Sequence, residues 1–199
     1  MAAKVLVDSK TNYPAACNSL ETLLVNKAVV GTILPKAAAA LIEKGVVLKC
    51  DPASKEALAH IGSNVQDAGP EDFDTEFLSL TLAVKVVDSL EEAILHINTH
   101  GSHHTETILT SDADEAERFM SAVDCAGAYW NASSRFADGM RYGFGTEVGI
   151  STNKIHSRGP VGLDGLMIYK YKLRGQGHIS AEFGSGEGQR EYKHEKLAL

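Results

Sequence analysis

Hydrophobic and polar positions follow two different patterns along the first 131 residues of the chain. Short apolar runs bounded by turn residues predict buried strands, whereas apolar positions spaced three or four residues apart predict helices. The predicted strands cover residues 22–26, 46–49, 82–87, 106–110 and 126–131. The predicted helices cover residues 34–44, 52–61 and 111–123, and a further helix begins within residues 88–92.

Several of these helical patterns carry start and stop signals. Pro35 lies in the first turn of the helix predicted at residues 34–44, and Gly45 follows its last residue. Asp88 or Ser89 can cap the next helix, and Ser111 the last one, because their oxygens accept from free backbone N–H groups. Strands that alternate with helices of about 10–13 residues imply right-handed crossovers. The sequence therefore predicts an α/β domain with a mostly parallel sheet covered on both faces.

The pattern changes after residue 131. Residues 132–165 are rich in Gly, Ser and Arg and show little periodicity, which predicts an ordered loop region. Residues 166–174 alternate like an exposed strand, and Lys170 and Lys172 suit a protected sheet edge between subunits of a homo-oligomer. We therefore divide the chain into an α/β domain at 1–131, a loop region at 132–165, and an oligomerisation strand with a polar tail at 166–199.

Composition and charge narrow the classes of function. The 199 residues carry 26 acidic and 19 basic side chains, a net charge of −7, which argues against a nucleic-acid or anionic-membrane partner. The longest apolar stretches, residues 36–42 and 80–87, are far shorter than a bilayer-spanning helix. The chain opens without a signal-peptide pattern, and three widely spaced cysteines fit a reducing compartment. We expect a cytoplasmic protein, or a mitochondrial one in a eukaryote.

One of the three cysteines stands in a distinctive setting. Cys17 follows Pro14 and two alanines on a bend, where a substrate can reach it and a nearby helix N-terminus would lower its pKa. The alternative is a small buried hydrophobic residue, which is the common state of a free cysteine. Cys50 and Cys125, each next to a predicted strand, fit that second description.

Four blocks of sequence resemble one enzyme family. Residues 13–25, which contain Cys17, closely resemble the nucleophile segment of γ-glutamyl phosphate reductase, a branch of the aldehyde dehydrogenase superfamily. The blocks at residues 130–139, 143–152 and 155–163 follow in that family's order, so the resemblance covers essentially the whole chain. The polar ending is more similar to that of the eukaryotic bifunctional Δ1-pyrroline-5-carboxylate synthase. The resemblance implies an aldehyde-dehydrogenase-like three-layer catalytic domain with a C-terminal oligomerisation β-segment.

The resemblance also implies an activity and its partners. Such enzymes use NADPH to reduce γ-glutamyl phosphate to glutamate 5-semialdehyde in proline biosynthesis, and a glutamate kinase domain or subunit accompanies them. Cys17 would attack the acyl phosphate and form a thioester that accepts hydride. The family's NADPH-binding part lies mostly before the nucleophile, so this chain would be the C-terminal half, inactive alone. Two alternatives stay open: an inactive assembly or regulatory fragment, and another thiol-dependent aldehyde dehydrogenase that oxidises its substrate.

Further site residues follow from the same resemblance and from their positions. Glu76 falls where aldehyde dehydrogenases carry a glutamate that contacts the nicotinamide ribose, or else it is a solvated loop carboxylate. Asn131, Ser134 and Arg135 follow a predicted strand, where open α/β sheets place ligand sites. Arg135 suits a two-pronged grip on the substrate's α-carboxylate, or else a structural ion pair with an acidic neighbour, Asp138 or Glu147.

Three other features of the sequence have both a functional and a structural interpretation. His156 and Arg158, beside Gly159, are placed either to contact phosphate or to brace the loop. His100, His103 and His104 are candidate zinc ligands, but Gly101 ends the helix at His100, so the three cannot share one helical face. No Cys or carboxylate stands at a spacing that would complete a tetrahedral site. We therefore expect no metal site and assign these histidines to a helix end and a loop. The glycine run at residues 143–149 lacks dinucleotide-fingerprint spacing and predicts a turn close to the active site.

Overall fold

The computed structural model of the chain describes residues 1–154 and 156–195. The chain divides into two compact units, Met1–Leu166 and Met167–Leu199. The predicted segments at 1–131 and 132–165 both lie in the first unit. The second unit contains a short 3₁₀ helix at Ser180–Glu182.

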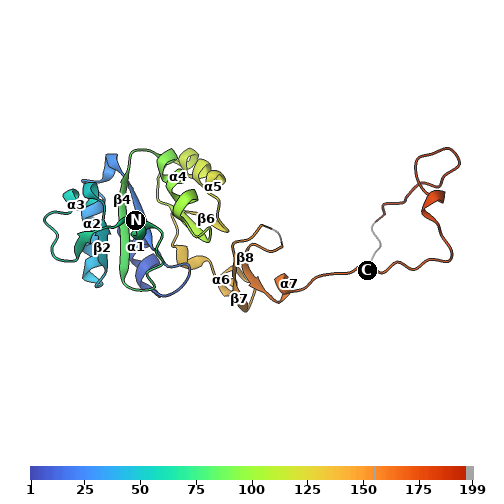
Figure 1. The fold of residues 1–199 in the computed structure, drawn as a ribbon, viewed down its shortest axis with the longest axis horizontal. Coiled ribbons are helices and arrows are strands. Elements are labelled where there is room, and N and C mark those ends of the chain that lie inside the picture. Colours follow the sequence, from blue (N-terminus) through green and yellow to red (C-terminus); the bar gives the residue numbers. More distant parts are fainter. Residues whose placement is uncertain (155, 196–199) are drawn as a thin grey trace. The chain divides into compact units, whose positions relative to one another are not determined.

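A four-stranded parallel sheet forms the centre of the first unit (Figure 1). Its strands are β1 (Thr22–Asn26), β2 (Val47–Cys50), β3 (Val65–Asp67) and β4 (Thr81–Val87). They are ordered β1-β4-β2-β3, and every neighbouring pair is parallel. Parallel neighbours cannot be joined by tight turns, so the connections cross over the faces of the sheet.

α-Helices cover both faces of the sheet. They are α1 (Ala2–Thr11), α2 (Leu34–Glu43), α3 (Pro52–Ala57), α4 (Leu90–His100) and α5 (Ala113–Ala122). α2 and α3 connect strands of the sheet and lie on one side of it, and α4, with α5 beside it, lies on the other (Figure 1). α1 packs against α2. This three-layer α/β arrangement confirms the fold class that the sequence predicts.

The helix ends follow the predicted capping signals with one exception. The Ser89 side chain accepts from the backbone N–H of Glu92 at 3.1 Å, and Gly101 ends α4. The last cap is Asp112 and not Ser111, because the Asp112 carboxylate accepts from both of the next free N–H groups, on Asp114 and Glu115.

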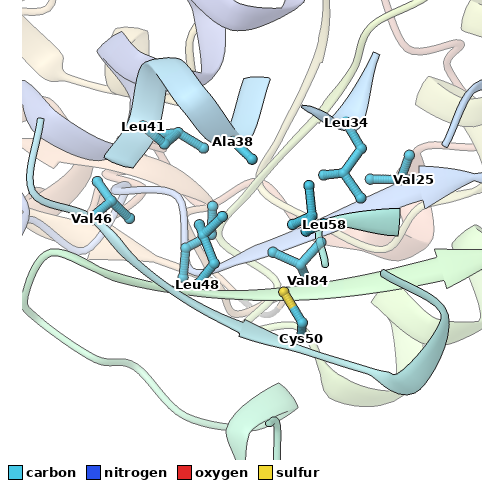
Figure 2. Close-up of a cluster of buried hydrophobic side chains, with 10 residues drawn as sticks. Val25, Leu34, Ala38, Leu41, Val46, Leu48, Cys50, Leu58 and Val84 are labelled. Atoms are coloured by element: carbon cyan, nitrogen blue, oxygen red, sulfur yellow. The ribbon is translucent and has the colours of Figure 1, made fainter. Parts of the chain in front are cut away.

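The main hydrophobic core lies between α2 and the sheet. Figure 2 shows Leu34, Ala38 and Leu41 of α2 directed at side chains of the strands. The cluster consists of Val25, Leu34, Ala38, Leu41, Val46, Leu48, Cys50, Leu58, Leu82 and Val84. Cys50 is 1% exposed, so it is the buried hydrophobic residue that the sequence predicts. This core fixes β1 and α2, and thereby the chain segment that leads out of the Cys17 bend.

The remaining parallel strands form a sheet of their own. β5 (Thr105–Ile108) and β6 (Gly127–Trp130) pair in parallel, with α5 as their crossover. Both strands are present where the sequence predicts them: β5 begins one residue earlier and ends two residues earlier than predicted, and β6 is one residue shorter at each end. Hydrophobic pattern identifies a strand but not its pairing partner, so the sequence could not separate this pair from the larger sheet.

A hairpin replaces part of the loop region expected at residues 132–165. β7 (Glu147–Ser151) and β8 (Gly159–Gly162) pair antiparallel, with an irregularity between Glu147 and Gly149. Their many Gly residues and Pro160 hide the period-two pattern, because backbone pairing needs no alternating side chains. Short helices flank the hairpin and the turns of this unit: α6 (Gly139–Tyr142), α7 (Leu163–Leu166), and 3₁₀ helices at Lys27–Val29, Pro70–Phe73 and Ser134–Phe136.

The strand predicted at residues 166–174 is absent from the part of the chain that the structure describes. Leu166 ends α7, and the residues after it belong to no helix or strand up to Ser180. Ile168, Tyr169, Tyr171 and Leu173 are 81–92% exposed. A strand exists only when another strand pairs with it, and within the described residues none lies beside this segment. Its role between subunits stays a prediction.

Candidate active site

Cys17 lies on a loop of tight turns that joins α1 to β1. The N–H of Ala16 donates to the Tyr13 carbonyl at 3.1 Å, and the N–H of Ser19 donates to the Ala16 carbonyl at 2.8 Å. These turns leave the Cys17 thiol exposed. The loop leads from a helix C-terminus into a strand, so the expectation that a helix N-terminus lowers the pKa of Cys17 is wrong.

The pKa of the Cys17 thiol is instead raised. The main cause is the partial loss of water around the sulfur, which disfavours the thiolate. The nearby carboxylates of Glu147 and Glu76 raise this pKa further, whereas the backbone N–H of Cys17 and the guanidinium of Arg135 lower it. Because screened charges act only over short range, Glu76, Glu147 and Arg135 are close enough to shift the pKa of this thiol.

A buried ion pair anchors the Cys17 loop where it leaves α1 and enters β1. Lys10 is fully buried, and its Nζ lies 2.8 Å from Oε2 of Glu21. The N–H of Leu20 donates to the Ser9 carbonyl at 3.0 Å beside this pair. Burial lowers the pKa of Lys10 and raises that of Glu21, while each partner counteracts the shift in the other. The two ends of the loop are thereby held together.

A second group of hydrogen bonds joins the Cys17 loop to residues 134–137. The Ser134 hydroxyl donates to the Asn18 carbonyl at 2.6 Å, and the Ser134 N–H donates to the Ser9 hydroxyl at 3.3 Å. The Asn18 side chain donates to the Ala137 carbonyl at 2.8 Å. Ser134 is buried, and its hydrogen bonds make it a structural support for the loop that carries Cys17.

Arg135 lies across the same loop. Its Nε donates to Oδ1 of Asn12 at 3.3 Å, and its Nη1 donates to Oδ1 of Asn18. Among the described residues no carboxylate forms an ion pair with Arg135, since Asp138 pairs with Arg141 at 3.2 Å and Glu147 accepts from the Gly139 N–H at 2.6 Å. The structural ion pair considered for Arg135 is therefore wrong, and its charge lies beside Cys17.

His104 is the site residue that sequence reasoning missed. Its Nε2 lies 3.3 Å from the Cys17 Sγ, and its Nδ1 lies 2.7 Å from the Thr105 hydroxyl. The ring is 6% exposed, and this burial lowers the pKa of His104. No spacing rule connects residues 87 positions apart, so only its position two residues before the strand predicted at 106–110 could have indicated His104. His100 and His103 face other partners, Asp74 and the Asp124 carbonyl.

Three predicted residues have structural partners away from the thiol. The Asn131 side chain binds both the N–H and the carbonyl of Thr110, at 3.1 and 2.8 Å, and so ties the end of β6 to the end of β5. His156 Nε2 lies 3.0 Å from the Gly165 carbonyl. Arg158 donates to Asp124 at 2.9 Å, so the structure shows it bracing the hairpin. Their contacts with substrate stay predictions.

Comparisons with known proteins give relatives along the whole chain, although no family model matches it. It is 56% identical over 202 residues to the probable γ-glutamyl phosphate reductase of Schizosaccharomyces pombe, covering 100% of this chain and 45% of that protein. It is 52% identical over 199 residues to the γ-glutamyl phosphate reductase of Methanosarcina acetivorans, covering 100% of this chain and 44% of the relative. The chain thus spans less than half the length of these relatives.

Solved structures agree with this result. The crystal structure of γ-glutamyl phosphate reductase from Thermotoga maritima matches with a TM-score of 0.83 and 40% identity, covering 89% of this chain and 42% of that chain. The Saccharomyces cerevisiae γ-glutamyl phosphate reductase matches with a TM-score of 0.54 and 33% identity, covering 90% of this chain and 39% of that one. A propionaldehyde dehydrogenase from Clostridium phytofermentans, 17% identical with a TM-score of 0.53 over 79% of this chain and 43% of that one, shares the fold.

The three-layer α/β fold and these matches define an aldehyde-dehydrogenase-like catalytic domain. More particularly, the chain belongs to the γ-glutamyl phosphate reductase family and corresponds to about 44% of a full-length member. The resemblance seen in the sequence is confirmed. The similarity of the polar ending to the bifunctional synthase stays a prediction. Among the helices of the described residues, none combines the length and the apolar character that crossing a bilayer requires.

Proposed function

We propose that this chain is the C-terminal catalytic part of an NADPH-dependent γ-glutamyl phosphate reductase, which forms glutamate 5-semialdehyde in proline biosynthesis. The observation that carries the proposal is Cys17: an exposed thiol on a loop anchored at both ends, within a chain 56% identical to a probable reductase of this type. A rigid, accessible nucleophile is what acyl transfer to sulfur requires.

The chemistry assigned to Cys17 is attack on an acyl phosphate. Sulfur forms a bond to the acyl carbon, phosphate leaves with the electron pair of the broken C–O bond, and a thioester on Cys17 results. Negative charge develops on the acyl oxygen during this step and has to be met by positioned N–H donors. The backbone N–H of Cys17, which already lowers the thiol's pKa, is a candidate donor.

NADPH supplies the hydride that reduces such a thioester to the aldehyde level. Glu76 is exposed and near Cys17, and a carboxylate in that position fits hydrogen bonds from a ribose hydroxyl. The glycine run at residues 143–149 leads into β7 of an antiparallel hairpin, so it does not form the strand–turn–helix cradle of a pyrophosphate. We assign the rest of the NADPH site to the part of the relatives that this chain does not match.

Arg135 is the proposed contact for the glutamyl α-carboxylate. Its two hydrogen-bond acceptors are neutral amides, Asn12 and Asn18. The carboxylates of Asp138 and Asp8 raise its pKa from a distance without an ion pair among the described residues, so the guanidinium can still bind an anion. The glutamate kinase domain or subunit would supply the acyl phosphate. The exposed apolar segment after Leu166 would join copies of the chain in a homo-oligomer.

A chimera tests this function. The matching segment of the S. pombe protein is replaced by this chain, and phosphate-dependent reduction of NADP⁺ by glutamate 5-semialdehyde is measured, which is the reverse reaction. We expect activity in the chimera and in its Cys125→Ser variant, and loss of activity in the Cys17→Ser variant. Activity that survives Cys17→Ser would refute the assignment of the nucleophile, and a folded chimera that uses other aldehydes but not this one would refute the substrate.

A further inference from the structure

The imidazole of His104 and the thiol of Cys17 are partners across two separate parts of the fold. His104 stands directly before β5, while Cys17 lies on the loop between α1 and β1, yet Nε2 and Sγ are 3.3 Å apart. The ring is buried and the thiol is exposed. The imidazole therefore approaches the sulfur from the protein side and leaves the solvent side open to a substrate.

The orientation of the His104 ring is fixed by its other neighbours. Nδ1 lies 2.7 Å from the Thr105 hydroxyl, and the His104 carbonyl accepts from the Gly127 N–H at 2.9 Å. The pairing of β5 with β6 thus holds the backbone, and Thr105 holds the ring. When Nδ1 carries the proton and donates to Thr105, Nε2 presents its lone pair to the Cys17 thiol.

We propose that His104 is a catalytic residue that accepts the Cys17 proton as the sulfur attacks the substrate. This inference rests on the proposed function for the identity of that substrate. The S–H bond breaks as the S–C bond forms, and the proton moves to Nε2. The phosphate leaves with the electron pair of the C–O bond, and the imidazolium returns the proton to it. No oxidant or reductant takes part in this step.

The charges around the pair support a neutral resting state. Burial lowers the pKa of His104 and raises that of Cys17, so an uncharged imidazole faces an uncharged thiol at neutral pH. The charged groups near the pair are Glu76 and Glu147, which raise both pKa values, and Arg135, which lowers that of Cys17. A thiol held in its protonated form needs a base at the moment of attack, and His104 is within reach.

The test is the rate at which iodoacetamide alkylates Cys17 in the 199-residue chain, mapped by peptide mass spectrometry between pH 4 and 9. This reaction needs neither NADPH nor an acyl phosphate, so it can fail or succeed independently of the proposed function. His104→Gln keeps a hydrogen-bonding group near the sulfur but cannot take its proton. His103→Gln, which changes the neighbouring histidine, is the matched control.

We expect His104→Gln to slow alkylation about 10-fold or more at pH 7, in line with the contribution of general bases, and His103→Gln to leave the rate unchanged. The rate of the His104 variant should follow the thiolate fraction up to high pH. The unmodified chain should show an additional inflection below pH 6.5, the ordinary pKa of histidine, because burial lowers the pKa of His104. If His104→Gln reacts at the original rate, the proposal is wrong. Should that variant not fold, absence of the inflection in the unmodified chain overturns it equally.

Discussion

At the scale of single residues, the site depends on how each charge is compensated. Arg135 has a guanidinium beside Cys17 with two neutral acceptors, whereas Asp124 has a carboxylate with two cations, Lys154 and Arg158. The guanidinium of Arg135 can therefore bind an anionic ligand, whereas the carboxylate of Asp124 is already bound to two cations of the protein. The two arginines predicted for the site differ accordingly: Arg135 contacts the Cys17 loop, whereas Arg158 braces the hairpin through Asp124.

Arg135, which forms no ion pair among the described residues, leads to a kinetic prediction. In the chimera, Arg135→Lys should mainly raise KM, because a point-charge ammonium cannot reproduce a two-pronged contact with a carboxylate remote from the reacting carbon. Loss of a charge-assisted contact of about 1.5–3 kcal/mol corresponds to a roughly 10- to 100-fold fall in kcat/KM. An unchanged kcat/KM with a lowered Tm would instead make Arg135 a clamp on the loop through Asn12 and Asn18.

The ion-paired carboxylate of Asp124 leads to a prediction about pH. Lys154 and Arg158 lower the pKa of Asp124 to about 2, below its ordinary value of about 4. Because the folded-state pKa is depressed, the bracing contact stabilises the fold above the unfolded pKa and is lost as the pH falls through about 2. A carbon NMR titration of the carboxyl group should show this low midpoint, and Arg158→Ala should raise it. A midpoint unaffected by Arg158→Ala would contradict the contact.

At the scale of elements, the buried pair of Lys10 and Glu21 joins α1 to the start of β1. Removing one partner of a buried ion pair costs about 3–5 kcal/mol, because the other charge is left without compensation. We expect Lys10→Met to lower the free energy of unfolding by about 3 kcal/mol, measured by urea denaturation, since the Phe77 N–H still donates to Glu21.

Two comparisons make the Lys10 result specific. Lys4→Met changes an exposed lysine on the same helix and should alter the free energy of unfolding by less than about 0.5 kcal/mol. Lys10→Met combined with Glu21→Gln should recover part of the loss, because no unpaired charge then remains. An equal loss in the two single lysine variants would show that the pair contributes nothing particular.

Local pattern was sufficient for the elements whose residues pack against the main core. β1 has the bounds that the sequence predicts, and α2, β2 and β4 differ from their predictions by one residue at one or both ends. α3 begins as predicted but ends four residues early. β3 was missed because three mostly exposed residues carry no apolar pattern, and the β7–β8 hairpin was missed because glycine conceals it.

The site divides in the same way. The setting of Cys17 and the resemblance of its segment identify it in the sequence as the candidate nucleophile. The contact of Cys17 with His104 and the support of Asn18 by Ser134 join positions 87 and 116 residues apart, and only the assembled sheets create them. Local rules also misjudged the electrostatics: the expected low pKa of Cys17 assumed a helix N-terminus where a strand begins.

At the scale of the whole molecule, the prediction concerns the cofactor. If most of the NADPH site lies outside this chain, its affinity for NADPH should be no tighter than millimolar, equivalent to about 4 kcal/mol of binding free energy. Trp130 is 42% exposed and serves as a fluorescence probe for the titration, with calorimetry as a second measurement. Micromolar binding would place the dinucleotide site within these 199 residues and overturn our division of the enzyme.

The hydrogen bonds of Ser134 that support the Cys17 loop also have a consequence for the order in which the site is made during translation. Ser9 and Ser134, whose hydrogen bond helps to hold the Cys17 loop, are separated by 125 residues. At a synthesis rate of about 5–20 residues per second, roughly 10 s pass between the appearance of Cys17 and that of its support on the ribosome. For that interval the thiol is on a nascent chain without Ser134, and for most of it without His104, which follows Cys17 by 87 residues. The surroundings of Cys17 are therefore completed late, after β1 to β6 have been made.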